Sequence, residues 1–257
     1  MADPTASPSP RDAASPPRAA TFALRERALV LGAGGALGSA LLAEALVAGR
    51  FAHVAALVKA PLASTPRGLG TLYEAELAAA VPPLADIAFL VFERERHANG
   101  RDEAFVQPQP QELLARASAL HAAGVRRLVV VLPHAPALLP AALKAGFASA
   151  AEQQVAALGF EHCVFLRAAQ AETGPAGASW LERVVALWLA QLRWMIPAQQ
   201  GALRTPRLAQ LVVLLARLLP SMPAGTRVVA PEALWDAAQQ PDDYQAEIKL
   251  AQALARR

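Results

Sequence analysis

Residues 28–46 read ALVLGAGGALGSALLAEAL: an apolar run, a cluster of four glycines and then a helical pattern. The apolar run has the length and the side chains of a buried strand. Leu37, Leu41 and Leu42 recur on one helix face, which predicts a helix over residues 36–48. A strand that passes through glycines directly into a helix is typical of the first turn of a β-α-β unit.

The glycines of this segment have separate uses beside a phosphate. Gly32 permits the sharp turn out of the strand, whereas Gly34 and Gly35 remove side chains that would keep backbone N–H groups from the phosphate. Gly38 lets the first helical turn pack closely on the strand. Because the helix begins there, its unpaired N–H groups and its positive dipole end face the anion. The predicted site for the diphosphate of a dinucleotide is Gly32, Ala33, Gly34, Gly35, Ala36, Leu37 and Gly38.

Beyond the glycines, apolar strands alternate with helices. We expect further strands at 54–58, 69–73, 86–92, 127–132, 162–166 and 226–229. We expect further helices at 111–123, 141–158, 180–195, 206–219, 231–238 and 244–254. Strands that are apolar throughout predict a parallel sheet that is buried on both faces. The sequence therefore predicts an α/β protein with a Rossmann-like, doubly wound parallel sheet and helices on both faces.

The two ends of this pattern set the expected domain organisation. Residues 1–22 are rich in proline, alanine and serine, with almost no large apolar side chain, which predicts a disordered tail. No second linker divides the rest, so residues 23–257 are expected to form a single domain. No signal peptide is recognisable, and the apolar run 208–219 falls short of the about 20 residues that span a bilayer. We expect a soluble, cytoplasmic protein without membrane contact.

The composition excludes several kinds of site. A net charge of +3 comes from 24 basic and 21 acidic residues without a basic run, so no nucleic-acid surface is predicted. Cys163 is the only cysteine, which excludes an intramolecular disulfide and favours a small buried side chain. The five histidines lack the spacing of metal ligands, and no metal site is predicted.

The residue after the second expected strand distinguishes NADP from NAD. An acid there would accept hydrogen bonds from the ribose hydroxyls, whereas a basic residue would pair with a 2′-phosphate. Lys59 holds this position with no acid nearby in sequence, and Arg67 is a second basic group. NADP(H) is therefore the predicted cofactor, with Lys59 in its site. The alternatives are a solvated Lys59 at a strand end and a glycine loop that has lost its ligand.

Several segments, taken in order, resemble an atypical short-chain dehydrogenase/reductase of the NmrA-like kind, close to the Tat-interacting-protein branch. The resemblance spans most of residues 27–238 and implies an NAD(P)-binding Rossmann fold. The segments are GAGGALG at 32–38, RDEAFVQPQPQELLARASALHAAGVRRLVVV at 101–131, FEHCVFLR at 160–167, PRLAQLVVLLARLLP at 206–220 and GTRVVAPEALW at 225–235.

The resemblance fails at the residues that carry catalysis. Catalytic members of the family place a serine at the end of the fifth strand and a Tyr-x-x-x-Lys motif on the next helix, where the tyrosine exchanges a proton. Here the strand ends with residues 132–134, Leu-Pro-His, without a serine. Neither Tyr73 nor Tyr244, the only tyrosines, has a lysine four residues later. No catalytic residue is assigned.

Other polar residues are expected near the ligand edge of the sheet. After the fourth strand the family carries a Gly-Thr-type turn, whereas residues 92–97 read FERERH and either narrow the nucleotide cleft or form a solvated loop. His134, Lys144 and Arg167 fall near the carboxyl ends of the fifth and sixth strands. His134 is the candidate for a substituted proton donor, although a lone loop histidine has an ordinary structural explanation as well.

Three functions remain open from the sequence. The favoured one is an NADP(H)-binding protein without the standard catalysis of the family, a redox-sensing or regulatory module. The first alternative is an NADP-dependent oxidoreductase or epimerase with a substituted proton donor. The second is an interaction protein with an empty nucleotide cleft. Besides the dinucleotide, the partner is an unknown small molecule or protein. The tryptophans at 180–195 are expected to pack against the core or a partner, and an exposed part of that helix face would be a homodimer surface.

Overall fold

The computed structural model describes residues 26–62, 64–79, 81–93, 102–134, 149–169 and 203–255. Seven strands form one sheet in the order β3-β2-β1-β4-β5-β6-β7, and each neighbouring pair is parallel. This arrangement confirms the predicted α/β class and Rossmann-like sheet. The strands are β1 (Glu26–Leu31), β2 (Phe51–Val58), β3 (Leu69–Tyr73), β4 (Ile87–Val91), β5 (Arg127–His134), β6 (His162–Ala169) and β7 (Gly225–Val229).

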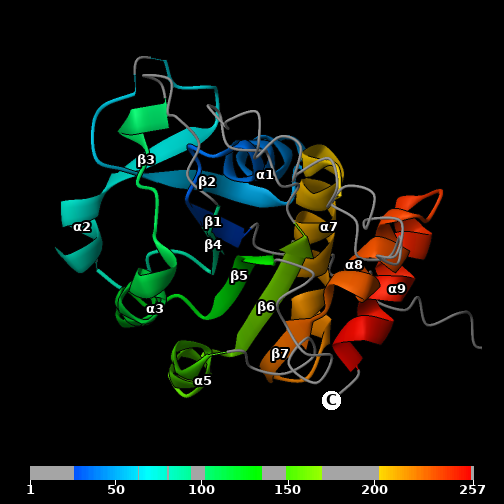
Figure 1. The fold of residues 1–257 in the computed structure, drawn as a ribbon. Coiled ribbons are helices and arrows are strands. Elements are labelled where there is room, and N and C mark those ends of the chain that lie inside the picture. The colour runs from blue at the N-terminus through cyan, green and yellow to red at the C-terminus, as the bar shows by residue number, and fades with distance from the viewer. Residues whose placement is uncertain are drawn as a thin grey trace, which may run out of the picture.

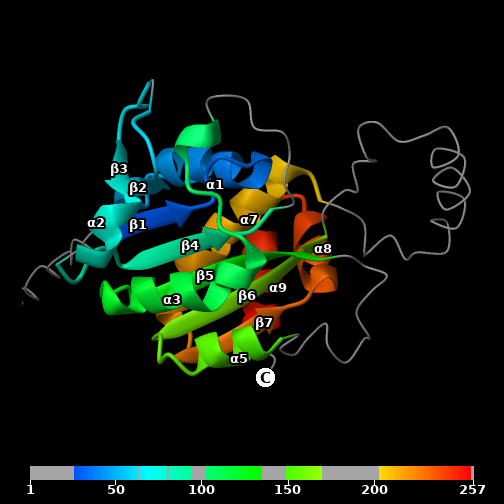
Figure 2. The ribbon, with the colours of Figure 1, turned by 60° about the vertical axis from the view of Figure 1, so that its left-hand side comes forward.

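Helices cover both faces of the sheet (Figures 1 and 2). One face packs against α1 (Ala36–Val47), α7 (Thr205–Leu218), α8 (Pro231–Ala238) and α9 (Asp243–Ala255). The other face packs against α2 (Glu74–Ala79), α3 (Leu113–Ala122) and α5 (Ala150–Ala156). Short 3₁₀ turns are η1 (Asp102–Ala104), η2 (Pro110–Glu112) and η5 (Leu219–Ser221).

The apolar composition of the strands follows from this double cover. In β1, Ala28 and Val30 belong to the core under α1 and α7, whereas Leu29 and Leu31 belong to the core under α3 and α5. Successive side chains of a strand point to opposite faces, so a strand between two helical layers must be apolar at every position. Cys163 in β6 is buried as expected, at 1% exposure, and burial raises the pKa of its thiol to about 12.

Most expected elements are present, with few differences among the described residues. The helix α2 after β3 was not predicted. The strand β2 begins at Phe51, earlier than expected, because Ala52 and His53 are exposed and interrupt the apolar pattern. The tail at 1–22, the helix at 180–195 and most of the first half of the helix at 141–158 lie outside the described residues.

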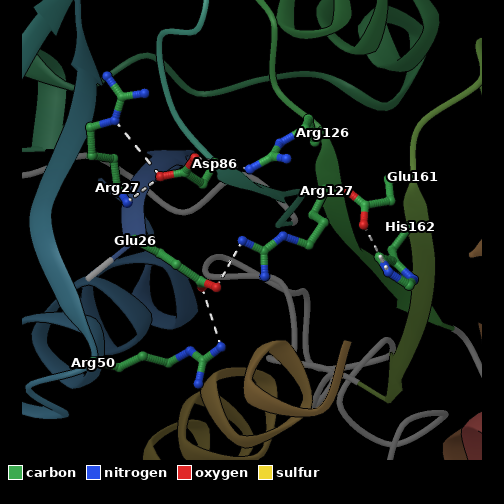
Figure 3. A network of polar contacts seen from close by, with 8 residues as sticks. All are labelled: Glu26, Arg27, Arg50, Asp86, Arg126, Arg127, Glu161 and His162. Carbon is green, nitrogen blue, oxygen red and sulfur yellow. Dashed lines mark hydrogen bonds and ion pairs between the residues drawn. The ribbon is translucent and has the colours of Figure 1, made fainter. Parts of the chain in front are cut away.

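Ion pairs join the amino ends of the central strands (Figure 3). Glu26 of β1 accepts from Arg127 of β5 at 2.9 Å and from Arg50, just before β2, at 3.3 Å. Asp86, just before β4, accepts from the backbone N–H of Arg27 at 2.8 Å. Because Arg127 is buried, Glu26 supplies a charge that its guanidinium needs.

Among the described residues, no helix has both the length and the apolar character required to cross a membrane.

Candidate functional site: the glycine loop

The glycine loop, residues 32–38, lies at the carboxyl end of β1 beside the end of β4. These strands are neighbours, with Leu31 opposite Leu90. The helix after β1 covers one face of the sheet, and α3, which follows β4, covers the other. From β1 the chain adds β2 and β3 on one side, and it then returns to add β4 and the later strands on the other side of β1. The order of the strands therefore reverses between β1 and β4. The crevice at such a reversal is where open α/β sheets bind ligands.

The loop has the backbone geometry that its glycines predict. Gly32 has a φ of +88°, and a Cβ atom there would overlap the carbonyl oxygen of Val91. A Cβ atom at Gly38 would overlap the carbonyl oxygen of Gly32. Both positions therefore require glycine, the first for its turn into the loop and the second for the close approach of α1.

The amino end of α1 already holds a carboxylate. The backbone N–H of Leu37 donates to Oε1 of Glu93 at 2.6 Å. Glu93 lies two residues after β4, and its second carboxylate oxygen fills the space that a Cβ atom of Gly35 would need. The first turn of α1 contains no acidic residue of its own. The loop thus presents its N–H groups and helix dipole to an anion, and that anion belongs to the same chain.

A second side chain occupies the next two amides of the loop. With its amide oriented by the hydrogen-bond network, the side-chain oxygen of Gln107 accepts from the N–H groups of Gly34 and Gly35, each at 2.9 Å. The N–H of Gly32 donates to the carbonyl oxygen of Val106 at 3.2 Å. Glu93 and Gln107 both belong to the connection between β4 and α3. Residues 92–97 were expected either to narrow the nucleotide cleft or to form a solvated loop; Phe92 and Glu93 are described, whereas residues 94–97 lie outside the described residues. The position of Gln107 was not predicted.

The same connection crosses the carboxyl edge of β2. Phe105 forms an antiparallel bridge with Val58, and the N–H of Lys59 donates to the carbonyl oxygen of Ala104 at 2.8 Å. The side chain of Lys59 is exposed, as is Arg67 in the turn before β3. The sequence places no acid near Lys59, but the fold brings the exposed Glu103, the neighbour of Ala104, to this edge.

The two tyrosines lie on β3 and on α9. Tyr73 ends β3, which is four strands from β5 in the sheet, or about 19 Å. Tyr244 belongs to α9 and is 69% exposed. Arg167, near the end of β6, is buried and forms an ion pair with the buried Glu152 of α5 at 2.9 Å. Lys144 lies outside the described residues.

The order of the parallel strands, with helices on both faces, defines a protein of the Rossmann-fold class. No family model matches the chain, and no curated protein matches it. Similar solved structures include a Rossmann-fold NAD(P)-binding family protein from Shigella flexneri, with 13% identity over 79% of this chain and 92% of that one, at a TM-score of 0.44.

Two further solved structures have comparable similarity. One is the Bordetella bronchiseptica enzyme WbmG in complex with NAD, with 17% identity over 85% of this chain and 79% of that one, at a TM-score of 0.45. The other is an oxidoreductase of the short-chain dehydrogenase/reductase family from Burkholderia thailandensis, with 17% identity over 80% of this chain and 91% of that one, at a TM-score of 0.42.

Proposed function

We propose that this protein binds NADP(H) at the glycine loop and acts as a regulatory or redox-sensing module. The observation that carries the proposal is the hydrogen bond from the Leu37 N–H to the Glu93 carboxylate, 2.6 Å long. A carboxylate is a chemical stand-in for a phosphate oxygen, and the amino end of α1 holds it beside the carboxyl ends of β1 and β4. The residues of the loop itself fit a diphosphate, since Gly34 and Gly35 carry no side chains of their own over their N–H groups.

The preference for NADP(H) rests on the basic groups beyond β2. Lys59 and Arg67 are exposed and lie at the end of β2 and before β3, where a Rossmann protein contacts the adenosine ribose. A 2′-phosphate there would gain an ion pair that NAD(H) cannot form. The exposed Glu103 opposes this preference, so the difference between the two nucleotides is expected to be modest.

A role without the standard reductase chemistry follows from the missing proton donor. In the catalytic short-chain dehydrogenases/reductases that the sequence resembles, the tyrosine that exchanges a proton lies on the helix that follows the fifth strand. Tyr73 is four strands away, and Tyr244 faces solvent on α9. A bound dinucleotide would therefore report the redox or nucleotide state of its surroundings to a partner rather than enter that reaction.

Titration of the purified protein with NADPH and NADH tests the proposal, with nicotinamide fluorescence as the signal. The expected result is saturable binding that is stronger for NADPH, without NADPH oxidation when a panel of carbonyl compounds is added. Gly35→Asp should abolish binding, because it places a second carboxylate in the space already shared with Glu93. Carbonyl-dependent oxidation that is lost in His134→Ala would instead establish the substituted-donor enzyme.

A second candidate function is favoured by the side chains in the loop. The N–H groups of Gly32, Gly34, Gly35 and Leu37 all have acceptors from the connection between β4 and α3. A loop that is permanently closed in this way would make the protein an interaction module on a Rossmann scaffold. Absence of binding for both nucleotides, in the native protein and after removal of the Glu93 side chain, would favour this function.

A further inference from the structure

We propose that Glu93 is an autoinhibitory residue, whose carboxylate occupies the diphosphate position of the glycine loop and keeps dinucleotide affinity low. This inference rests on the proposed function and adds the regulation of its site. The Glu93 carboxylate and the diphosphate of the nucleotide compete for the loop, which cannot bind both at the same time.

The competition follows from the space and the donors involved. The N–H of Leu37 donates to the carboxylate at 2.6 Å, so it is not available to a second anion. The other oxygen fills the volume that the missing side chain of Gly35 leaves open. That volume is what a Rossmann loop provides for a phosphate. Two anions so close together would also repel each other, at a site that water only partly screens.

The backbone around Glu93 holds the competing carboxylate near the loop. Phe92 is buried, and its N–H donates to the carbonyl oxygen of Val131 in β5 at 2.9 Å. Glu93 therefore begins from a fixed point at the end of β4. An intramolecular group has a high effective concentration, so the carboxylate competes even with abundant nucleotide.

Gln107 also occupies the loop, but it carries no charge. Its side-chain oxygen accepts from the N–H groups of Gly34 and Gly35 as a neutral amide. A diphosphate forms stronger, charge-assisted hydrogen bonds with the same donors, so it can displace Gln107 more easily than Glu93. The inhibition is therefore assigned to the charge of Glu93, and Glu93→Gln should relieve most of it while keeping the side-chain shape.

The test measures binding of inorganic pyrophosphate and of NADPH by isothermal titration calorimetry. The proteins are the native chain, Glu93→Ala, Glu93→Gln and Asp236→Asn, an exposed residue of α8 whose substitution changes net charge as Glu93→Gln does. We expect at least about tenfold tighter binding of both ligands by the two Glu93 variants, with Asp236→Asn unchanged. The backbone amide resonances of Gly35 and Leu37 should change in NMR chemical shift when either ligand binds. If Glu93→Ala does not fold, Glu93→Gln still decides, because its amide can accept from Leu37.

Each outcome has a distinct meaning. Tighter pyrophosphate binding by the Glu93 variants without NADPH binding would support the inhibitory carboxylate and refute the proposed cofactor. Equal NADPH affinity in the native protein and in both variants would support the proposed function and overturn the inhibition. Failure of every protein to bind either ligand would overturn both.

Discussion

The N–H of Leu37 donates to the carboxylate of Glu93 at 2.6 Å, although 56 residues separate the two in sequence. This contact joins the end of β4 to the start of α1 at the point where the sheet order reverses. The first turn of α1 lacks an acid, so Glu93 supplies from outside the helix the negative charge that its dipole favours. The same contact stabilises the native loop and opposes its ligand.

The contact between Glu93 and Gly35 can be measured in a double-mutant cycle. Gly35→Ala should destabilise the native protein, because the added Cβ atom overlaps the Glu93 carboxylate. In a Glu93→Ala background the same substitution should cost much less, with a coupling of about 0.5–3 kcal/mol in the free energy of unfolding. Urea unfolding of the four proteins gives this coupling. An equal cost of Gly35→Ala in both backgrounds would show that the two residues do not meet.

Nucleotide preference is expected to depend on Lys59. Lys59→Gln should weaken NADPH binding a few-fold and leave NADH binding nearly unchanged, because an exposed ion pair with a 2′-phosphate contributes about 1 kcal/mol or less. Competitive titration of both nucleotides in the Glu93→Ala background measures the ratio. Lys249→Gln, an exposed lysine of α9, is the matched control. Equal weakening of NADPH and NADH by Lys59→Gln would remove Lys59 from the 2′-phosphate site.

Removal of the Glu26 charge should destabilise the fold strongly. Arg127 is 5% exposed and Glu26 accepts from it at 2.9 Å, so Glu26→Gln leaves a buried guanidinium without its carboxylate. A loss of about 3–5 kcal/mol in the free energy of unfolding is expected. Asp236→Asn, which removes an exposed carboxylate, should change stability little. A similar melting temperature for both variants would contradict the role given to the pair in Figure 3.

His162 is expected to make the fold sensitive to acid. Burial lowers the pKa of its imidazole; the Glu161 carboxylate opposes this, and Arg227 and Arg127 add to it. The unfolded chain therefore binds a proton at a higher pH than the native protein does. Stability should fall as pH decreases below about 6.5, the ordinary pKa of histidine.

Variants separate this effect from the titration of carboxylates. The slope of unfolding free energy against pH below about 6.5 should be shallower in His162→Asn than in the native protein. Substitution of the exposed His53 by glutamine should leave the slope unchanged. If His162→Asn keeps the full slope, its imidazole is not responsible for the acid sensitivity.

The sequence predicted the sheet well because the physics of its strands is local. In β4 and β5 every residue between two helical layers has to be apolar, and such runs stand out. The turn at Gly32 was also predictable, since glycine is the residue that accepts its positive φ. By contrast, α2 spans six residues directly after β3 and is too short to show a helical period.

The side chains that fill the loop depend on long-range contacts. No periodicity relates Glu93 to Leu37 or Gln107 to Gly34, because these pairs meet only once β1 and β4 are paired. One signal was present in the sequence. An acid directly follows an expected buried strand, and the helix that begins at the glycine loop has no acid in its first turn. That combination indicates an anion position that the chain itself could fill.

The claim that the glycine loop is a diphosphate site is tested most directly by a crystal structure of the Glu93→Ala variant grown with NADPH. We expect diphosphate oxygens at about 2.7–3.2 Å from the backbone nitrogens of Gly35 and Leu37, with the side chain of Gln107 displaced. A structure in which these N–H groups are bonded only to protein or water, with the nucleotide elsewhere or absent, would contradict it.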